Sequence, residues 1–204
     1  EKYGKALEYI NTSVSKRAEA LYLLRYLQET LGNIELTAVG SHFVPVANAL
    51  AKGDKNGAME AAKGLEGRIN NFFINYSLPT DRKVAKALIK VYKEKVKPEN
   101  RPSFYATIDS KFNGNIDAFV DDMFDNSVFT SVEKINNTLA NNPESIINDP
   151  ALITGKSISM LMPALNAAVN AANANFAAGH KAYIAGLLEM KKGVAMYPDA
   201  NSTM

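Results

Sequence analysis

Apolar residues recur along this chain at alternating steps of four and three, a period that points to helices from the first residues on. Tyr3, Leu7, Ile10 and Val14 begin the pattern, which is typical of the buried stripe of an amphipathic helix. Strict alternation of apolar and polar residues, which would indicate strands, is nearly absent, and no repeat of fixed length is apparent. The sequence therefore predicts an all-α protein, a multi-helix bundle of roughly eight helices.

Glycine and proline mark the expected ends of the helices in the first half of the chain. We expect one helix to end at Gly32 and a second to run from about 36 to 52, with a kink at Pro45 because proline lacks a backbone N–H. A third helix should continue to about Tyr76. Thr80 is the expected N-cap of the helix that follows.

Capping residues mark the expected starts of the helices in the second half. Asn115, Thr130 or Ser131, and Asp149 have side chains that accept hydrogen bonds from the first turn of a helix. Pro150 suits the first helical position after Asp149. The last helix should continue to about 192, bent or interrupted near Pro163.

Composition bounds the class of protein. The chain has 204 residues, of which 47% are hydrophobic and 22% charged, which fits about one globular domain. No uninterrupted apolar run approaches the roughly 18 residues that a membrane span needs, so we expect no membrane span. The absence of cysteine excludes disulfides, thiol nucleophiles and thiolate metal ligands. A net charge of +2 gives no argument for nucleic acid as a partner.

The two histidines are candidate metal ligands or catalytic bases, and neither interpretation finds support nearby. His42 and His180 lie far apart in the sequence, and no HExxH motif is present. The nucleophile motif GxSxG is missing as well. We therefore assign no catalytic, cofactor-binding or metal-binding residue, and expect no metal or organic cofactor.

A cluster of aspartates and a stripe of basic residues are candidate binding features of opposite charge. Three aspartates share one helix face, and the spacing and glycine of a calcium loop are absent, so a solvated acidic face is favoured. The basic stripe could bind phosphates or an anionic membrane, but an ordinary polar helix face explains it more simply. The aspartates are Asp117, Asp121 and Asp125, with Asp122 beside them, and the stripe is Arg82, Lys86, Lys90, Lys93 and Lys97.

Asparagines line one face of the alanine-rich final helix. Asn166, Asn170 and Asn173 could bond to a neighbouring helix or to an extended peptide, and alanine lets another helix approach closely. Exposure to solvent is the simpler interpretation. None of these features establishes an enzyme.

Three longer stretches resemble one family: NYSLPTDRKVAKALIKVY (75–92), RPSFYATIDSKFNGNIDAFVDDMFDNSVFTS (101–131) and MYPDANSTM (196–204). They are similar to the bacterial serine dipeptidyl-peptidases of the type seven and type eleven group, in the chymotrypsin clan. The resemblance implies a double β-barrel that carries the Ser-His-Asp triad, with a large helical domain inserted in it that caps the cleft. It is weaker over the first helices.

Under this resemblance, residues 1–195 would be part of the helical cap, and residues 196–204 would lead back into the barrel. Both ends of the sequence then look like cuts inside a longer polypeptide. The resemblance implies a non-catalytic cap domain of an enzyme that releases dipeptides from a free N-terminus. Its implied partners are the catalytic β-barrel of the same polypeptide and peptide substrates, in a parent that could be a homodimer.

The resemblance also implies a location in the periplasm or at the surface of a Gram-negative bacterium. No residue of this chain matches a triad motif, so no catalytic role is carried over. The alternative is a free-standing helical module that binds peptides or anions and has no enzymatic activity.

Overall fold

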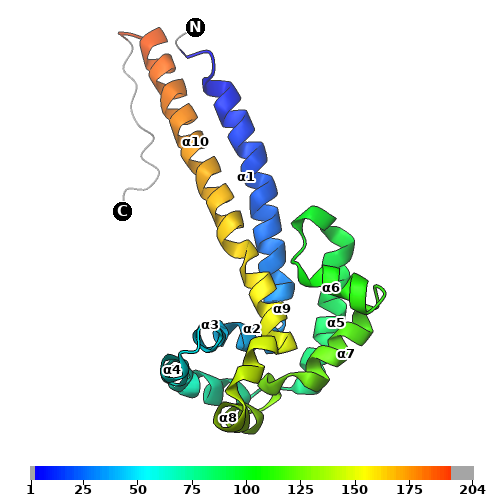
Figure 1. Cartoon of the computed structure of the whole chain (residues 1–204). Helices are drawn as coiled ribbons and strands as arrows, with labels where there is room; N and C mark the ends of the chain where they lie inside the picture. Colours follow the sequence, from blue (N-terminus) through cyan, green and yellow to red (C-terminus); the bar gives the residue numbers. More distant parts are fainter. Residues whose placement is uncertain (1–2, 194–204) are drawn as a thin grey trace. The chain divides into compact units, whose positions relative to one another are not determined.

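The computed structural model describes residues 3–193, and all regular elements in this range are helical (Figure 1). The range holds ten α-helices, so the prediction of an all-α fold is confirmed and the expected number of roughly eight is too low. The α-helices are α1 (Ala6–Glu29), α2 (Glu35–His42), α3 (Val44–Ala51), α4 (Lys55–Phe73), α5 (Leu78–Lys95), α6 (Phe104–Lys111), α7 (Ile116–Asn126), α8 (Val132–Asn141), α9 (Pro150–Ser159) and α10 (Leu161–Met190). Four 3₁₀ helices join them: η1 (Leu31–Asn33), η2 (Pro98–Asn100), η3 (Val128–Thr130) and η4 (Pro143–Asn148).

The chain divides into two compact units. The first unit consists of Glu1–Tyr22 with Leu165–Met204, and the second is Leu23–Ala164. The expected linker at residues 196–204 lies outside the described residues. The prediction of one helical domain over residues 1–195 is not tested by this division, because compactness alone does not define a domain boundary.

Prolines account for the additional helices. At Pro45 the expected kink is a complete break, because α2 ends at His42 and α3 begins at Val44, which places the proline in the first turn of a new helix. A proline is tolerated there since the first N–H groups of a helix have no partner within it. Near Pro163 the expected interruption is also a break, at Met160, between α9 and α10.

The expected N-caps of the second half are confirmed in the structure. Asn115 accepts a hydrogen bond from the backbone N–H of Ala118, and Ser131 caps α8 in the same way. Asp149 caps α9 through bonds from the N–H groups of Ala151 and Leu152. The expected cap at Thr80 is wrong, because α5 begins one turn earlier, and the Thr80 hydroxyl bonds to that of Ser77.

The second unit is built around a core of large apolar side chains contributed by most of its helices. Its largest fully buried members include Leu27, Phe43, Ile89, Met123 and Phe129. Phe43 packs against Phe129 with ring centroids 4.8 Å apart, which joins the α2–α3 junction to η3. Burial of this kind is the main source of stability for a helical domain.

Two buried aspartates tie helix ends to distant parts of the second unit. Asp81 in α5 accepts hydrogen bonds from the N–H groups of Glu35 and Leu36, at 2.9 and 2.8 Å, and so caps α2 from another helix. Asp149 also accepts from the Val128 N–H. Burial raises the pKa of both carboxyl groups, and the hydrogen bonds that each accepts oppose that effect.

In the first unit, the parts of α1 and α10 that belong to it form an antiparallel pair (Figure 1). A Cβ on Gly186 would lie 3.1 Å from the Tyr3 ring, and a Cβ on Gly179 would lie 3.1 Å from the Ala6 carbonyl oxygen, so residue numbers rise along one helix as they fall along the other. Small residues at intervals of seven line the contact: Ala6, Ser13 and Ala20 on α1, and Ala172, Gly179 and Gly186 on α10. Small side chains let the two backbones approach closely.

Among residues 3–193, one segment meets the length and hydropathy limits of a membrane span. Pro150–Met190 reaches a mean hydropathy of 1.2 over 18 residues, and 28% of that window is buried. Length and composition alone are weak evidence, because a helix of a water-soluble protein passes the same test. The expectation of no membrane span remains a prediction.

Candidate functional site

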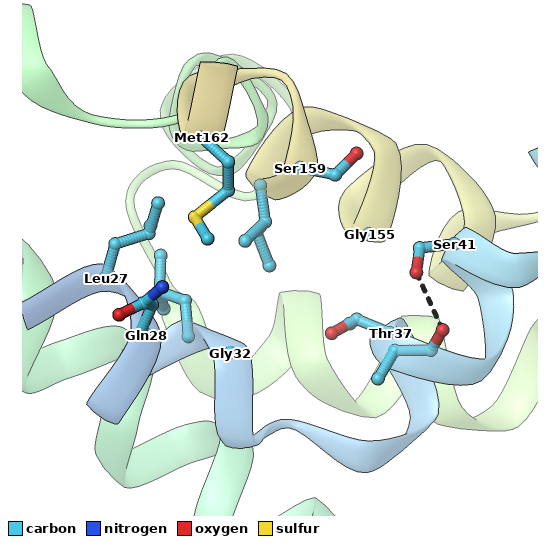
Figure 2. Close-up of a pocket in the computed structure, with 11 residues that line it drawn as sticks. Leu27, Gln28, Gly32, Thr37, Ser41, Gly155, Ser159 and Met162 are labelled. Atoms are coloured by element: carbon cyan, nitrogen blue, oxygen red, sulfur yellow. Dashed lines mark hydrogen bonds between the residues drawn. The ribbon is translucent and has the colours of Figure 1, made fainter. Parts of the chain in front are cut away.

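A surface cavity lies where α9 crosses α2, in the second unit. Its volume is about 290 Å³, and α1, η1 and the start of α10 complete its walls. Figure 2 shows Leu27 and Met162 at one end of it and Thr37 and Ser41 at the other. Gly155 lines it as well, at the point where α9 comes closest to α2.

The hydroxyl groups around this cavity already donate their protons to their own helices. Ser41 Oγ donates to the Ala38 carbonyl at 2.7 Å, and Thr37 Oγ1 donates to the Ile34 carbonyl at 2.9 Å. No histidine lines the cavity, so neither hydroxyl has a base beside it that would make it a nucleophile. The cavity can hold an apolar group, and its hydroxyl oxygens can accept a hydrogen bond from an N–H group. These properties suit the binding of a ligand.

The structure places the two histidines on α2 and α10, in different units. His42 Nε2 lies 3.5 Å from Arg68 Nη1 on α4, and the His180 ring stacks on Phe176 with centroids 5.9 Å apart. Burial lowers the pKa of His42, and the positive charge of Arg68 lowers it further. Across residues 3–193, no hydrogen bond joins a histidine to a serine, and no group of three His, Asp or Glu side chains is placed to hold a metal.

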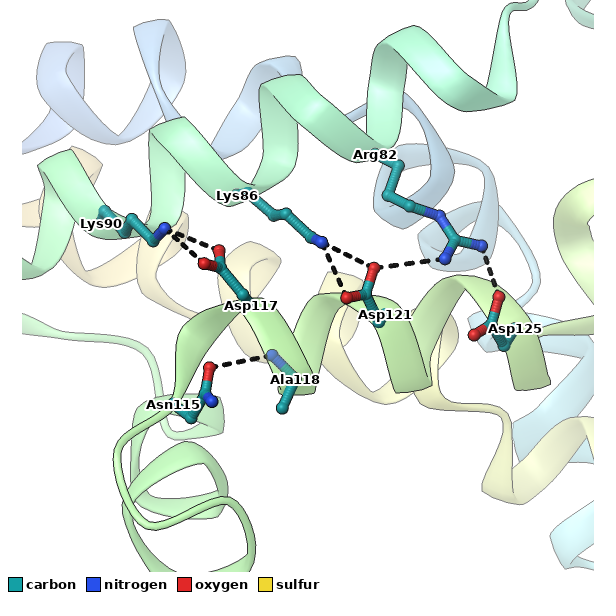
Figure 3. A network of polar contacts seen from close by, with 8 residues as sticks. All are labelled: Arg82, Lys86, Lys90, Asn115, Asp117, Ala118, Asp121 and Asp125. Atoms are coloured by element: carbon teal, nitrogen blue, oxygen red, sulfur yellow. Dashed lines mark hydrogen bonds and ion pairs between the residues drawn. The ribbon is translucent and has the colours of Figure 1, made fainter.

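The acidic cluster and the basic stripe bind each other across α5 and α7 (Figure 3). Lys90 Nζ lies 2.7 Å from Asp117, and Lys86 Nζ lies 2.7 Å from Asp121. We call this set the ion-pair ladder; it consists of Arg82, Lys86, Lys90, Asp117, Asp121 and Asp125. Lys93 pairs separately with Asp109 of α6, and Lys97 is not part of the ladder.

Arg82 anchors one end of the ladder. Its guanidinium bridges two aspartates, with Nη1 3.2 Å from Asp121 and Nη2 2.5 Å from Asp125, and it also lies over the Phe124 ring. The hydrogen bond to Asp125 raises the pKa of Arg82, and the hydrogen bond from Lys86 lowers that of Asp121. The carboxylate of Asp125 therefore favours the charged form of Arg82, and Lys86 favours the charged form of Asp121.

The sequence-based interpretations of the acidic cluster and of the basic stripe were both incomplete. The basic stripe is not a free anion-binding surface along its first three members, and the acidic residues on the shared face are not merely solvated. Asp122 lies off this face and accepts from Asn126 instead. The sequence does contain an indication of this contact. Basic residues on one helix and acidic residues on another both recur at steps of four, so they can face each other in register.

The asparagines of α10 lie where the simpler interpretation placed them. Asn166, Asn170 and Asn173 are all exposed in this structure. The contact of Arg68 with His42, which joins α4 to α2, could not be predicted from the sequence, because nothing in the local pattern of α4 distinguishes Arg68 from the other charged residues there.

Comparison with known proteins defines the family. Residues 1–204 match the family described as Peptidase S46, and the chain belongs to this family. It is 31% identical to Dipeptidyl-peptidase 7 of Phocaeicola vulgatus over 99% of its length, and 28% identical to an Asp/Glu-specific dipeptidyl-peptidase of Porphyromonas gingivalis over its whole length. The resemblance to bacterial dipeptidyl-peptidases is thereby confirmed.

The chain spans 28% and 29% of the lengths of these two relatives. Its fold matches the crystal structure of Porphyromonas endodontalis DPP11 with a TM-score of 0.73 and 25% identity, covering 98% of this chain and 28% of that one. The match therefore extends to helical architecture as well as to sequence.

Proposed function

We propose that this chain is a non-catalytic helical cap domain of a serine dipeptidyl-peptidase. The observation that carries the proposal is the match of nearly the whole chain to about 28% of DPP11 and of related dipeptidyl-peptidases. All regular elements of this segment within residues 3–193 are helical. Neither the cavity nor the ion-pair ladder places a base beside a hydroxyl group, as a catalytic serine requires. Both features therefore support a non-catalytic role for this domain.

In this proposal the chemistry belongs to a β-barrel part of the same polypeptide. A serine there attacks the second peptide bond from the N-terminus, a histidine acts as general base, and backbone amides stabilise the oxyanion. The cap limits which peptides reach that serine, by excluding long or blocked N-termini from the cleft. The relatives are bacterial, and we assign the parent to the periplasm or the cell surface.

The alternative of a free-standing anion-binding module depended mainly on the basic stripe, which the structure shows to be partly paired. Arg82, Lys86 and Lys90 already have carboxylate partners, so an anion would have to displace an aspartate from each of them. Such exchange offers little net gain in free energy, because one ion pair replaces another.

The test compares the 204-residue chain with the complete polypeptide encoded by the gene. Both are incubated with dipeptidyl reporter substrates and with a serine-reactive phosphonate. We expect the complete polypeptide to release dipeptides and to be labelled, and the 204-residue chain to do neither. Specific labelling of a serine within the 204 residues, or an inactive and unlabelled complete polypeptide, would refute the proposal.

A further inference from the structure

The part of α10 in the first unit carries no charge over more than half of its length. From Leu165 to Gly179 the sequence contains no Asp, Glu, Lys or Arg. In the structure, Ala172 and Gly179 are the buried residues of this stretch, and most of the others are exposed. Helix faces in contact with water normally carry charges, whereas the centres of contact surfaces are depleted of them. An exposed helix without charges is therefore unusual for a surface that stays in water.

Larger apolar residues accompany the small residues of the contact between α1 and α10. They also recur at intervals of seven along each helix. The stripe on α10 is Val169, Phe176, Tyr183 and Met190, and the stripe on α1 is Leu7, Val14 and Leu21. Leu7 is 57% exposed, Val14 50% and Met190 84%, which are high values for side chains of this size.

The two stripes meet on one face of the helix pair. A cavity of about 550 Å³ lies there in the first unit, and its lining includes Leu7 from the α1 stripe and both Tyr183 and Met190 from the α10 stripe. We call the α10 stripe, the α1 stripe and this cavity the apolar face of the helix pair. It is concave at one end, where Glu189 also lines the cavity, and α10 carries no Asp, Glu, Lys or Arg from Leu165 to Gly179.

We propose that the apolar face is covered by a further α-helix from the same complete polypeptide, outside residues 1–204. Spacing of seven is the interval at which one helix meets another along a supercoiled contact, so a third helix can pack along these residues as α1 and α10 pack against each other. The inference rests on the proposed function, because the related dipeptidyl-peptidases have more than twice as many residues outside the matched segment as within it. The part of the covering helix that meets Leu165–Gly179 is apolar and uncharged, since this stretch offers no opposite charge to a charge buried against it.

The absence of cysteine from the chain allows a direct test. Asn173 lies one turn from both Val169 and Phe176, so Asn173→Cys reports on the apolar face. Glu66→Cys, at an exposed position of α4 in the second unit, is the control. Each variant is prepared in the 204-residue chain and in the complete polypeptide. The rate of maleimide modification at the introduced cysteine is then followed by mass spectrometry of the labelled peptide.

We expect the Asn173→Cys thiol to react at least about tenfold more slowly in the complete polypeptide than in the 204-residue chain, because a buried site reacts only when it opens. The Glu66→Cys thiol should react equally in both. Equal rates for Asn173→Cys would overturn the inference. So would protection in the 204-residue chain that grows with protein concentration, which would assign the face to a second copy.

A second variant covers the case in which Asn173→Cys folds poorly. Phe176→Lys should lower the melting temperature of the complete polypeptide much more than that of the 204-residue chain, where Phe176 is half-buried and loses its stacking on His180, because only the former buries the new charge fully. The same shift in both forms would contradict the inference. Dipeptide release is measured separately. A complete polypeptide that protects the cysteine but lacks peptidase activity would refute the proposed function and still support the covering helix.

Discussion

A Cβ atom on Gly155 of α9 would lie 2.1 Å from the carbonyl oxygen of Thr37 on α2, well inside any real contact. On the facing helix, a Cβ on Gly40 would lie 2.7 Å from the carbonyl carbon of Ala151. The backbones of the two helices therefore touch where they cross, and only glycine fits at either position. The same crossing forms one wall of the cavity in Figure 2.

Replacing this glycine should separate the two helices. We expect Gly155→Ala to lower the free energy of unfolding by at least about 2 kcal/mol, because the methyl group meets backbone that cannot rotate away. Gly64→Ala is the matched control, since a Cβ there has no atom within 4 Å and alanine favours a helix interior. Urea unfolding should show Gly64→Ala to be equal to or more stable than the parent chain. A Gly155→Ala variant as stable as the parent would contradict the close approach.

If the ion-pair ladder stabilises the chain, stability should depend on opposite charges facing each other across α5 and α7. Lys86→Asp alone should destabilise the chain, because Asp121 would then face a carboxylate, and adding Asp121→Lys should restore part of the loss. Urea unfolding at low salt and at about 1 M NaCl checks this, because salt screens exposed pairs and should shrink the difference.

A matched control for the ladder uses a charge on the same helix that lies outside it. Lys83→Asp on α5 changes the net charge by the same amount as Lys86→Asp, and Lys83 has no carboxylate partner in the ladder. Its effect should be smaller, and Asp121→Lys should not rescue it. If both lysine variants behave alike, the contact between α5 and α7 does not depend on the ladder.

The contact of His42 with Arg68 predicts a loss of stability in mild acid. Burial and the charge of Arg68 hold the pKa of His42 below its usual value, which is about 6.5 in an unfolded chain. The folded state therefore favours the neutral ring, and its contribution to stability is complete above about pH 6.5 and declines as the pH falls through that value. Unfolding free energies between about pH 7.5 and 5 should decline more for the parent chain than for His42→Gln.

Arg68→Gln separates the two causes of this pKa shift. It removes the charge and leaves the burial, so the pKa of His42 should rise part of the way towards its usual value. Proton NMR titration in a His180→Gln background, which leaves one histidine signal, measures this directly. A pKa of His42 at or above its usual value in the parent chain would show that the ring is not held neutral.

Much of the helical fold could be predicted because each signal was local. Asn115, Ser131 and Asp149 each cap the helix that begins next to them, and capping depends on one side chain and the turn that follows. Pro45 was identified as a disruption, but sequence alone did not distinguish a kink from a new helix. Phe43, which stands at the break, packs against Phe129 of η3, far away in the sequence.

Contacts between distant helices were not predictable in the same way. The ladder pairs α5 with α7, and from one helix at a time its charges look like two solvated faces. Asp81 caps α2 from another helix, so its role has no signature in its own neighbourhood. The crossing at Gly155 and the cavity beside it also depend on how α2 and α9 pack, which local propensity does not specify.

The central claim is that this helical domain controls access to a peptidase site elsewhere in the polypeptide. The most direct measurement replaces residues 1–195 with a short linker in the complete polypeptide and compares kcat/KM for peptides with free and with acetylated N-termini. We predict that the preference for free N-termini falls at least about tenfold, or 1.4 kcal/mol, while labelling by a small serine-reactive phosphonate continues. A folded deletion variant that keeps the full preference for free N-termini would contradict the account.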